Sequence, residues 1–525
     1  MRSLFKPKYI KSFSSKIPDI ITAIGLAFLI FFILLPFTHL GVDMVDDGVM
    51  LKPALDLVHN KMLFKDTFTQ YGPLYILLES WILKYFGTYL ISLKIWIDFM
   101  YALTGIVLYI ISRRYSGKFI SVLFVSIWLL LSPVFNNNFY IWPNVVGAFF
   151  ISLSFLIYVY NRSSVITPRN TFYIGIFFAL STWCKQPFFI FLLIFTGYYC
   201  LLYLYGKISF KKLLRQQLAL WLGFFIISSV LLIWIISNGA LKDFFLQEIR
   251  IGYIWGRILG RNYSPISYIQ QPLLYFWVIV PMIYFILFIN SILHLYKREK
   301  NTGAINNLGI SLFGISTSAQ YYPYPINETS HLYWALTPVF TYSCYVLYQK
   351  LFLPLFNRMR DGSYTQLNTQ FYLLIVIILV ISITHEFTNR ITSAAYKVNT
   401  LNTLIQRPRV LTEIYTSAQN AAYYNDVYLK MHSYLMTHPR TSFIIYASSA
   451  SMYTTFTNKS VNILSFYADF SGFTSGVYPY SAALNNYVRN NKPLILTSSH
   501  NINRLPNYYI LDSWKKYSYI LAAPK

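Results

Sequence analysis

Three aspartates, Asp43, Asp46 and Asp47, lie together in residues 42–48, whose sequence is VDMVDDG. Carboxylates in such a position can stabilise the start of a helix, because they interact favourably with the positive end of its dipole. A carboxylate can also act as a general base, or bind a metal ion through its oxygen atoms. The cluster by itself therefore allows two interpretations, a solvated helix start and a catalytic or metal-binding site.

The residues after these acids follow a recognisable order. Asp66 is followed by residues 70–75, QYGPLY, and Lys94 comes seven residues after Gly87. This order resembles the first outer loop of the GT-C class of membrane glycosyltransferases, which includes protein O-mannosyltransferases and the lipid A aminoarabinose transferase. In that class an acidic pair, a second acid, a Gly-Pro-Leu element and a basic residue on the next span follow one another. The resemblance is good over residues 1–200 and loose beyond them.

The resemblance implies a glycosyltransferase that takes a sugar from a polyprenyl-phosphate donor and passes it to an extracytoplasmic glycan, lipid or protein acceptor. The family's catalytic acid falls on Asp46, with Asp47 beside it and Asp43 as the rival for the same role. Its second loop acid falls on Asp66, a candidate substrate-binding residue. An ionised Asp suits an inverting displacement, because one base suffices when the leaving group is a phosphate.

The leaving phosphate needs cations, and Lys185 in residues 183–187, WCKQP, is the first candidate. The GT-C class commonly places a Lys or Arg at this outer end of a span, where its charge can stabilise a phosphate oxygen. Its structural alternative is a side chain that extends toward lipid headgroups. Lys94 could hold the first-loop acids or the phosphate, or form an ion pair with Asp98, four residues later on the same helix face. Arg257 is a weaker candidate for the phosphate.

A late outer segment, residues 320–332, has the sequence QYYPYPINETSHL. It resembles a Pro-Arg-x-Asp-x-x-His-Leu element of bacterial GT-C relatives. Pro325, Glu328 and His331 match that element, whereas Ile326 replaces its Arg and so removes a direct phosphate contact. Glu328 and His331 are therefore candidate substrate-binding residues. His331 could hydrogen-bond to donor or acceptor, or it could cap the following helix.

The composition excludes a single soluble globule. Of the 525 residues, 56% are hydrophobic and only 12% are charged, whereas soluble domains contain about 25% charged residues. The net charge of +25 would by itself suit nucleic-acid binding. However, Lys and Arg concentrate in short loops that we assign to the cytoplasmic side, as the positive-inside rule requires. We therefore expect membrane lipids as partners and no nucleic acid.

A helix that crosses a bilayer needs about 20 apolar residues, and eleven ranges approach this requirement. We expect an α-helical polytopic protein of the bacterial inner membrane, with its N-terminus in the cytoplasm and its C-terminus outside. The transmembrane catalytic domain would cover residues 1–386, and an extracytoplasmic domain would cover residues 387–525. The expected spans are 18–40, 88–112, 119–134, 143–160, 171–187, 188–206, 217–238, 272–296, 305–320, 331–353 and 366–386.

Two outer segments are too long to be simple connections. The long first outer loop, residues 41–87, shows helical periodicity from Val49 to Asn60, which predicts a helix lying on the membrane surface. The tail, residues 387–525, has strand-like stretches at Ser442–Tyr446 and Pro493–Thr497, which predict a small mixed α/β domain. The many Tyr and Asn side chains of this domain could help to hold a sugar-containing acceptor.

A transporter or flippase of lipid-linked glycans is the alternative function, because it would share the spans and the outer basic residues. It would not need a carboxylate cluster on the first outer loop. The sequence has no zinc-site spacing and no phosphate-binding loop, so it implies no certain cofactor. A divalent metal ion is the cofactor that the acids could bind, with oxygen ligands from Asp43, Asp46, Asp47 and Glu328 if the fold brings them together.

Overall fold

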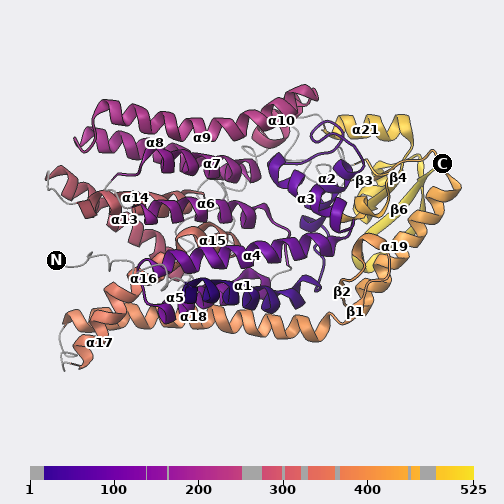
Figure 1. The fold of residues 1–525 in the computed structure, drawn as a ribbon. Helices are drawn as coiled ribbons and strands as arrows, with labels where there is room; N and C mark the ends of the chain where they lie inside the picture. The colour runs from indigo at the N-terminus through magenta and orange to yellow at the C-terminus, as the bar shows by residue number, and fades with distance from the viewer. Residues whose placement is uncertain are drawn as a thin grey trace.

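The computed structural model describes residues 17–136, 139–161, 165–250, 275–297, 302–320, 329–360, 367–446, 451–461 and 480–525. Figure 1 shows a bundle of long helices with a small domain of helices and strands at one end. The two helices of the first outer loop, α2 (Asp46–Val58) and α3 (Pro73–Phe86), lie at this end, beside the small domain. The acids at the start of α2 are thereby placed where the two parts of the molecule meet.

Helices occupy each of the eleven ranges that the sequence predicts as spans. In four of these ranges the helices are shorter or more polar. They are α5 (Lys118–Leu130), α7 (Pro168–Cys184), α14 (Thr302–Ala319), and α15 (Thr329–Leu336) followed by α16 (Phe340–Leu347). Seven helices in the described part of the chain are long and apolar enough to cross a membrane: α1 (Ile17–Thr38), α4 (Leu90–Arg113), α6 (Pro143–Tyr160), α8 (Phe189–Leu204), α9 (Phe210–Ser237), α13 (Tyr275–Tyr296) and α18 (Leu367–Thr400). The protein therefore has the helical membrane architecture that its composition predicts.

Proline and hydroxyl side chains mark where several helices begin. Pro73, Pro143 and Pro168 are the first residues of α3, α6 and α7. Proline suits this position, because the N–H that it lacks would have no helical partner there. The side chain of Thr167 accepts a hydrogen bond from Asn170 N and so caps α7. Local sequence thus fixes where these helices start.

Helices α7 and α9 pack with their backbones in direct contact. A Cβ added at Gly175 in α7 would lie 2.1 Å from Leu220 O, and one added at Gly223 in α9 would lie 2.1 Å from Phe172 O. Only glycine leaves room for this approach, which is typical of membrane helices, where close packing drives association. The contact holds α7 in place, and α7 ends directly before Lys185.

Helix α2 confirms the helix predicted after the acids but not its predicted setting. All ten residues from Asp47 to Asp56 are buried, whereas a helix on a membrane surface would leave one face open to water. Helix α3 packs against α2, and so does η10 (Ser451–Phe456), a 3-10 helix of the C-terminal domain. The prediction of a membrane-surface helix is therefore wrong, because protein covers α2 on both faces.

The C-terminal domain is built on a four-stranded sheet with the strand order β3-β4-β6-β5. Strands β3 and β4 are parallel, and the other neighbouring pairs are antiparallel. Both predicted strand stretches are confirmed, as β3 and β4. The elements of the domain are β1 (Thr403–Leu404), β2 (Tyr415–Thr416), α19 (Ala418–Thr437), β3 (Phe443–Tyr446), α21 (Tyr480–Asn491), β4 (Leu494–Ser498), β5 (Tyr508–Trp514) and β6 (Tyr519–Pro524). Helix α18 leads into the domain without a break, so the expected boundary at residue 387 falls inside this helix.

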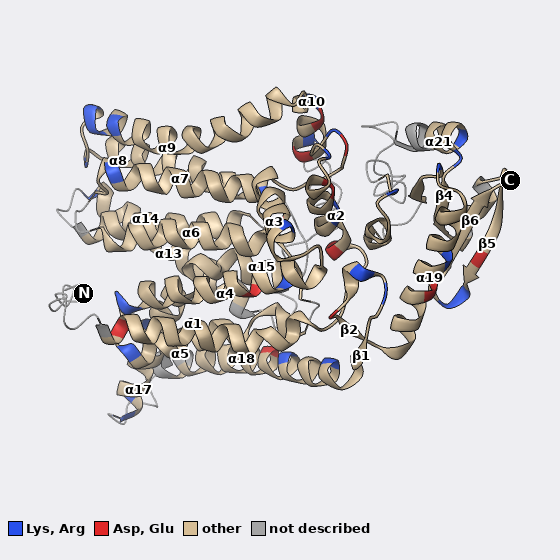
Figure 2. Ribbon diagram, turned by 45° about the vertical axis from the view of Figure 1, so that its right-hand side comes forward, with Lys and Arg blue, Asp and Glu red and all other residues tan. Residues whose placement is uncertain are grey.

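Charged side chains are distributed unevenly along the bundle. Figure 2 shows Lys and Arg at the end of the bundle where α1 begins, and both acids, near α2 and α10 (Leu241–Phe244), and further Lys and Arg toward the C-terminal domain. The first group includes Arg113 and Lys118 on either side of the turn between α4 and α5, and Lys211 and Lys212 at the start of α9. Two of the basic segments that the sequence assigns to the cytoplasmic side, residues 113–118 and the start of α9, thus lie at one end of the bundle.

Bulky side chains in the α7–α9 contact should destabilise the bundle. Gly175→Leu and Gly223→Leu should each lower the free energy of unfolding by about 1–3 kcal/mol, because the new side chain must separate two backbones. Gly197→Leu in α8 is the matched control, since nothing lies within 4 Å of a Cβ at that position. Thermal unfolding of the purified protein in detergent measures the effect. Equal midpoints for the control and the two variants would contradict the backbone contact.

Candidate active site

Asp43 is tied to the backbone at the start of α2. Its Oδ1 accepts hydrogen bonds of 2.8 Å from Val45 N and from Asp46 N. The N–H of Asp43 donates to Asp47 Oδ2 at 3.0 Å. The first amides of a helix have no partner within the helix, so the carboxylate of Asp43 satisfies them and gives the acid loop, residues 42–48, its shape.

Asp47 is held from the other side by Lys94 of α4. Lys94 Nζ lies 3.6 Å from Asp47 Oδ2 and donates a 2.6 Å hydrogen bond to Gly41 O. Both side chains are fully buried. Burial raises the pKa of Asp47 to about 6, and the positive charge of Lys94 opposes that rise. Of the alternatives for Lys94, the structure shows contact with the first-loop acids, and the ion pair with Asp98 is not formed because Lys94 reaches across to Asp47.

Asp46 has a different environment from the acids on either side. It is the first residue of α2, it is partly exposed, and it interacts electrostatically with Lys185. The carboxylates of Asp43 and Asp47 are engaged with backbone amides and with Lys94. Asp46 therefore differs from the other two acids in that its electrostatic partner is Lys185.

A close backbone contact brings Lys185 to this place. A Cβ added at Gly72 would lie 2.0 Å from Trp183 O, and Gly72 N donates a 3.2 Å hydrogen bond to Cys184 O. Only glycine allows this approach, which joins the start of α3 to the end of α7. The Gly-Pro element of the sequence thus has a physical reason. Gly72 fits against the end of α7, and Pro73 begins α3.

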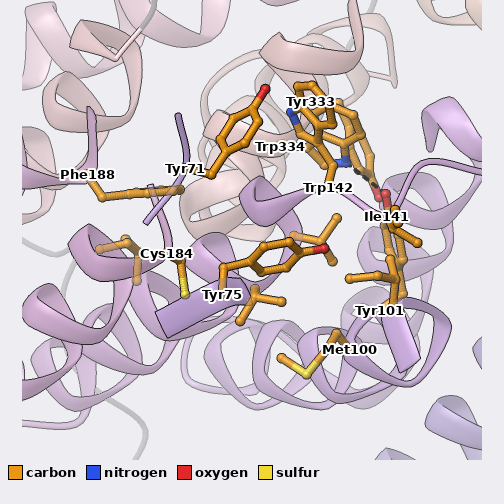
Figure 3. Packing of buried hydrophobic residues seen from close by; sticks show 14 of the residues in the cluster. Tyr71, Tyr75, Met100, Tyr101, Ile141, Trp142, Cys184, Phe188, Tyr333 and Trp334 are labelled. Carbon is orange, nitrogen blue, oxygen red and sulfur yellow. Dashed lines mark hydrogen bonds between the residues drawn. The ribbon is translucent and has the colours of Figure 1, made fainter. Parts of the chain in front are cut away.

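Aromatic rings surround the ammonium group of Lys185. Its Nζ lies 5.9 Å from the centroid of the Tyr71 ring and 5.4 Å from that of Trp142. A cation is attracted to the faces of aromatic rings at such distances. Figure 3 shows Tyr71, Trp142 and Trp334 grouped in the buried cluster between the helices. Lys185 itself is 9% exposed, so its charge is held in a setting with little water.

His331 on α15 joins the same group. The centroid of its ring lies 6.2 Å from that of Trp142 and 5.5 Å from that of Trp334. It also interacts electrostatically with Lys185. Asp46, Lys185 and His331 are far apart in the sequence, yet Lys185 interacts electrostatically with both of the others. The fold thus brings together one candidate base, one candidate phosphate-binding cation and one candidate substrate-binding residue.

The other predicted site residues lie elsewhere or outside the described residues. Asp66 is exposed, and its Oδ2 accepts a 2.7 Å hydrogen bond from Met62 N within a turn of the first outer loop. Arg257 and Glu328 fall outside the residues that the structure describes. Within the described part of the chain, no three Asp, Glu, His or Cys side chains gather as a group that could hold a metal ion.

Sequence reasoning missed the tryptophans of the site. Trp142 and Trp334 contact Lys185 and His331, but aromatic residues make up 19% of the sequence, so a single Trp carries little information. The sequence contains one signal that points to Trp142. Trp142 directly precedes Pro143, the first residue of α6, and so marks the outer end of a predicted span, the level at which Lys185 was also placed.

The buried pair of Lys94 and Asp47 should show strong energetic coupling. Lys94→Met should lower the free energy of unfolding by about 3–5 kcal/mol, because it leaves a buried carboxylate without its cation. Adding Asp47→Asn to Lys94→Met should restore part of this loss. Lys61→Met is the control, because Asp56 keeps its second partner Lys52. Chemical denaturation measures Lys94→Met, Asp47→Asn, the double variant and Lys61→Met, and strictly additive effects at the two positions would refute the coupling.

Comparison with known proteins places this geometry in a known fold. No protein-family model and no curated protein matches the sequence. ArnT from Cupriavidus metallidurans, solved with bound undecaprenyl phosphate, superposes with a TM-score of 0.53 at 10% identity, covering 96% of this chain and 98% of that one. The archaeal oligosaccharyltransferase AglB from Archaeoglobus fulgidus, solved with an inhibitory peptide and a dolichol-phosphate, superposes with a TM-score of 0.50 at 11% identity, covering 91% of this chain and 70% of that one.

Both of these neighbours are GT-C glycosyltransferases. Identities of 10–11% establish a shared fold and leave the chemistry to be argued from the site. The match extends over nearly the whole of this chain and of ArnT, including the C-terminal domain. The chain therefore has the fold of the GT-C membrane glycosyltransferases, as its first outer loop predicted.

Proposed function

We propose that the protein is a membrane glycosyltransferase that moves a sugar from a polyprenyl-phosphate donor to an extracytoplasmic glycan, lipid or protein acceptor. The observation that carries this proposal is the grouping of Asp46, Lys185 and His331 at one end of a GT-C fold. The neighbouring structures were solved with undecaprenyl phosphate and with dolichol-phosphate. Both ligands are lipid phosphates, which supports a donor of the same kind.

Asp46 is the proposed general base. It is partly exposed, so an acceptor can reach it, and it interacts electrostatically with Lys185. Its carboxylate takes the proton of the acceptor's nucleophile while that nucleophile forms a bond to the sugar's anomeric carbon. The bond from this carbon to the phosphate oxygen breaks, and its electron pair leaves with the phosphate. The sugar is thereby transferred with inversion.

Lys185 is the proposed partner of the leaving phosphate. Negative charge develops on the phosphate as the bond breaks, and a fixed cation in a setting with little water stabilises such charge more than it would in bulk water. The rings of Tyr71 and Trp142 keep the ammonium in place. His331, beside Lys185, is proposed to hydrogen-bond to donor or acceptor.

The remaining predicted residues have supporting roles in this proposal. Lys94 is engaged with Asp47 and Gly41 O, so we assign it to holding the acid loop rather than to the phosphate. Arg257 is proposed as a further phosphate contact. Asp66 and Glu328 are proposed as substrate contacts, as the resemblance implies.

A divalent metal ion would need several oxygen ligands near Asp46, since Mg²⁺ and Ca²⁺ each take about six or more. The carboxylates of Asp43 and Asp47 are already bound to amides and to Lys94, and Glu328 lies outside the described residues. The described residues therefore fit such an ion poorly. No step of the proposed mechanism passes through a metal.

We propose the inner membrane of a bacterium as the location, with the N-terminus in the cytoplasm and the C-terminal domain outside. The Lys and Arg of residues 113–118 and of the start of α9, at the end of the bundle where α1 begins, support this orientation (Figure 2). In this orientation the acid loop and Lys185 lie at the outer boundary of the membrane. Residues 1–386 would form the catalytic membrane domain, and residues 387–525 the outer domain.

Reporter fusions test the orientation. Alkaline phosphatase is active only outside the cytoplasm, so we expect activity when it is fused after Lys525. The same enzyme fused to a chain truncated after Lys211, between α8 and the body of α9, should stay inactive. Phosphatase activity in the truncated fusion and none in the full-length fusion would reverse the proposed topology.

Removal of the proposed base tests the function. Purified protein in proteoliposomes is given a donor panel, undecaprenyl phosphates that carry different hexoses and pentoses, together with an envelope extract as acceptor. Release of undecaprenyl phosphate is measured. Asp46→Asn should slow transfer by about 10²–10⁴-fold, because it keeps the shape of the side chain and removes its basicity. Asp512→Asn, which breaks an exposed ion pair with Lys430, is the control and should retain the full rate.

Two outcomes would count against this function. Full transfer by Asp46→Asn would reject Asp46 as the base, and full transfer by Asp43→Asn as well would also exclude Asp43, its rival for that role. Absence of transfer from every donor, together with loss of export of a completed lipid-linked glycan in cells that lack the protein, would favour the transporter instead.

A further inference from the structure

A segment of the C-terminal domain is hydrogen-bonded to the backbone of the acid loop. Met452 N donates a 2.9 Å hydrogen bond to Met44 O, and Ser451 Oγ donates a 2.7 Å hydrogen bond to Val45 O. Ser451 and Met452 are the first residues of η10, and both are buried. The sequence places η10 about 400 residues after the acids, so this contact joins two segments that are far apart in the chain.

Gly48 makes this contact possible. A Cβ added there would lie 2.1 Å from Met452 N and 2.6 Å from Met452 Cα. These are backbone atoms, which cannot move aside as the end of a flexible side chain can. A glycine inside a helix costs about 1 kcal/mol relative to alanine, and the close approach of η10 gives a structural reason for glycine in the first turn of α2.

The same domain also holds the other side of the acid loop. Gly41 N donates a 2.9 Å hydrogen bond to Tyr415 O, and Tyr415 N donates a 2.7 Å hydrogen bond to His39 O. Tyr415 belongs to β2 of the C-terminal domain. Residues 42–48 are therefore fastened to this domain at both ends, before Asp43 by β2 and after it by η10.

These contacts fix the peptide groups next to the proposed base. The N–H of Asp46 and that of Val45 both donate to Asp43 Oδ1, and the carbonyl of Val45 accepts from Ser451 Oγ. The peptide group that joins Val45 to Asp46 is thus held from both sides. Helix α2 has no side-chain cap at Val45, so hydrogen bonds from outside the helix contribute to the geometry of its first turn.

We infer that Ser451 and Met452 are positioning residues of the active site, which hold the backbone of the acid loop so that the Asp46 carboxylate faces Lys185. This inference rests on the proposed function, since it assigns the C-terminal domain a role in the chemical step. It differs from acceptor binding by that domain. A loosened loop should slow the transfer step, because a base misplaced by about 1 Å can lose two orders of magnitude in rate, and it should leave the binding of the lipid phosphate intact.

Two variants of the full chain test the inference. Ser451→Ala removes the hydrogen bond to Val45 O without adding an atom, and Gly48→Ala pushes η10 away from α2. Their matched controls are Ser433→Ala, at an exposed position of α19, and Gly197→Ala, where a Cβ meets nothing within 4 Å. If Gly48→Ala does not fold, Ser451→Ala still decides the outcome.

Hydrogen exchange gives a readout that needs no sugar donor. Amides of residues 42–48 should exchange about twofold to tenfold faster in Ser451→Ala, the size expected for one lost hydrogen bond, whereas exchange in the sheet β3-β4-β6-β5 should not change. Binding of undecaprenyl phosphate should be the same as in the unaltered protein. With the best donor of the panel, kcat should fall by about 10- to 100-fold while KM for the donor stays the same.

The possible results separate the inference from the proposed function. Full transfer by Asp46→Asn would reject the proposed base and, with it, the catalytic role of the contact between η10 and the acid loop. Loss of transfer in Asp46→Asn, together with exchange rates and kcat in Ser451→Ala and Gly48→Ala that equal those of the controls, would reject the inference alone. A rise in KM with unchanged kcat would also reject it, because acceptor or donor binding would then be the role of the contact.

Discussion

The arrangement of the site depends on the burial of Lys94 against the first outer loop. A lysine ammonium inside a helix bundle must have polar partners, because an uncompensated buried charge costs several kcal/mol. Lys94 finds two of them, Asp47 and Gly41 O, on the two sides of the acid loop. The need to satisfy one buried cation therefore fastens the loop to α4, and with the loop fixed the carboxylate of Asp46 is left on the side of Lys185.

Two glycines then set how the parts around the acid loop approach one another. Gly72 lets the start of α3 lie against the end of α7, next to Lys185, and Gly48 lets η10 lie against the start of α2, next to Asp46. Contacts between backbones involve no rotatable side chains, so they define positions more tightly than packed side chains do. A catalytic geometry needs such support, since residues placed on rigid elements keep their relative positions better than residues on loose ones.

Much of the fold was predictable because its signals are local. Apolar runs gave the helices of the bundle, Pro143 began α6 at the expected residue, and the strand-like stretches became β3 and β4. The two interpretations that the structure does not bear out share one physical cause. Spacing suggested that Lys94 would pair with Asp98, and periodicity suggested that α2 would lie on the membrane, but both patterns report only neighbours along the same helix. The partners that decide both cases, Asp47 and η10, come from elsewhere in the chain.

The candidate site shows how three identical side chains acquire different properties. The Asp43 carboxylate accepts hydrogen bonds from two amides and so stabilises the conformation of the loop. Burial raises the pKa of Asp47 to about 6, and Lys94 keeps its charge compensated. Asp46 lies between them in the sequence, is partly exposed and interacts electrostatically with Lys185. Acids in different environments can take different roles in one site, and here the environment, rather than the residue type, distinguishes the proposed base from the two acids that support it.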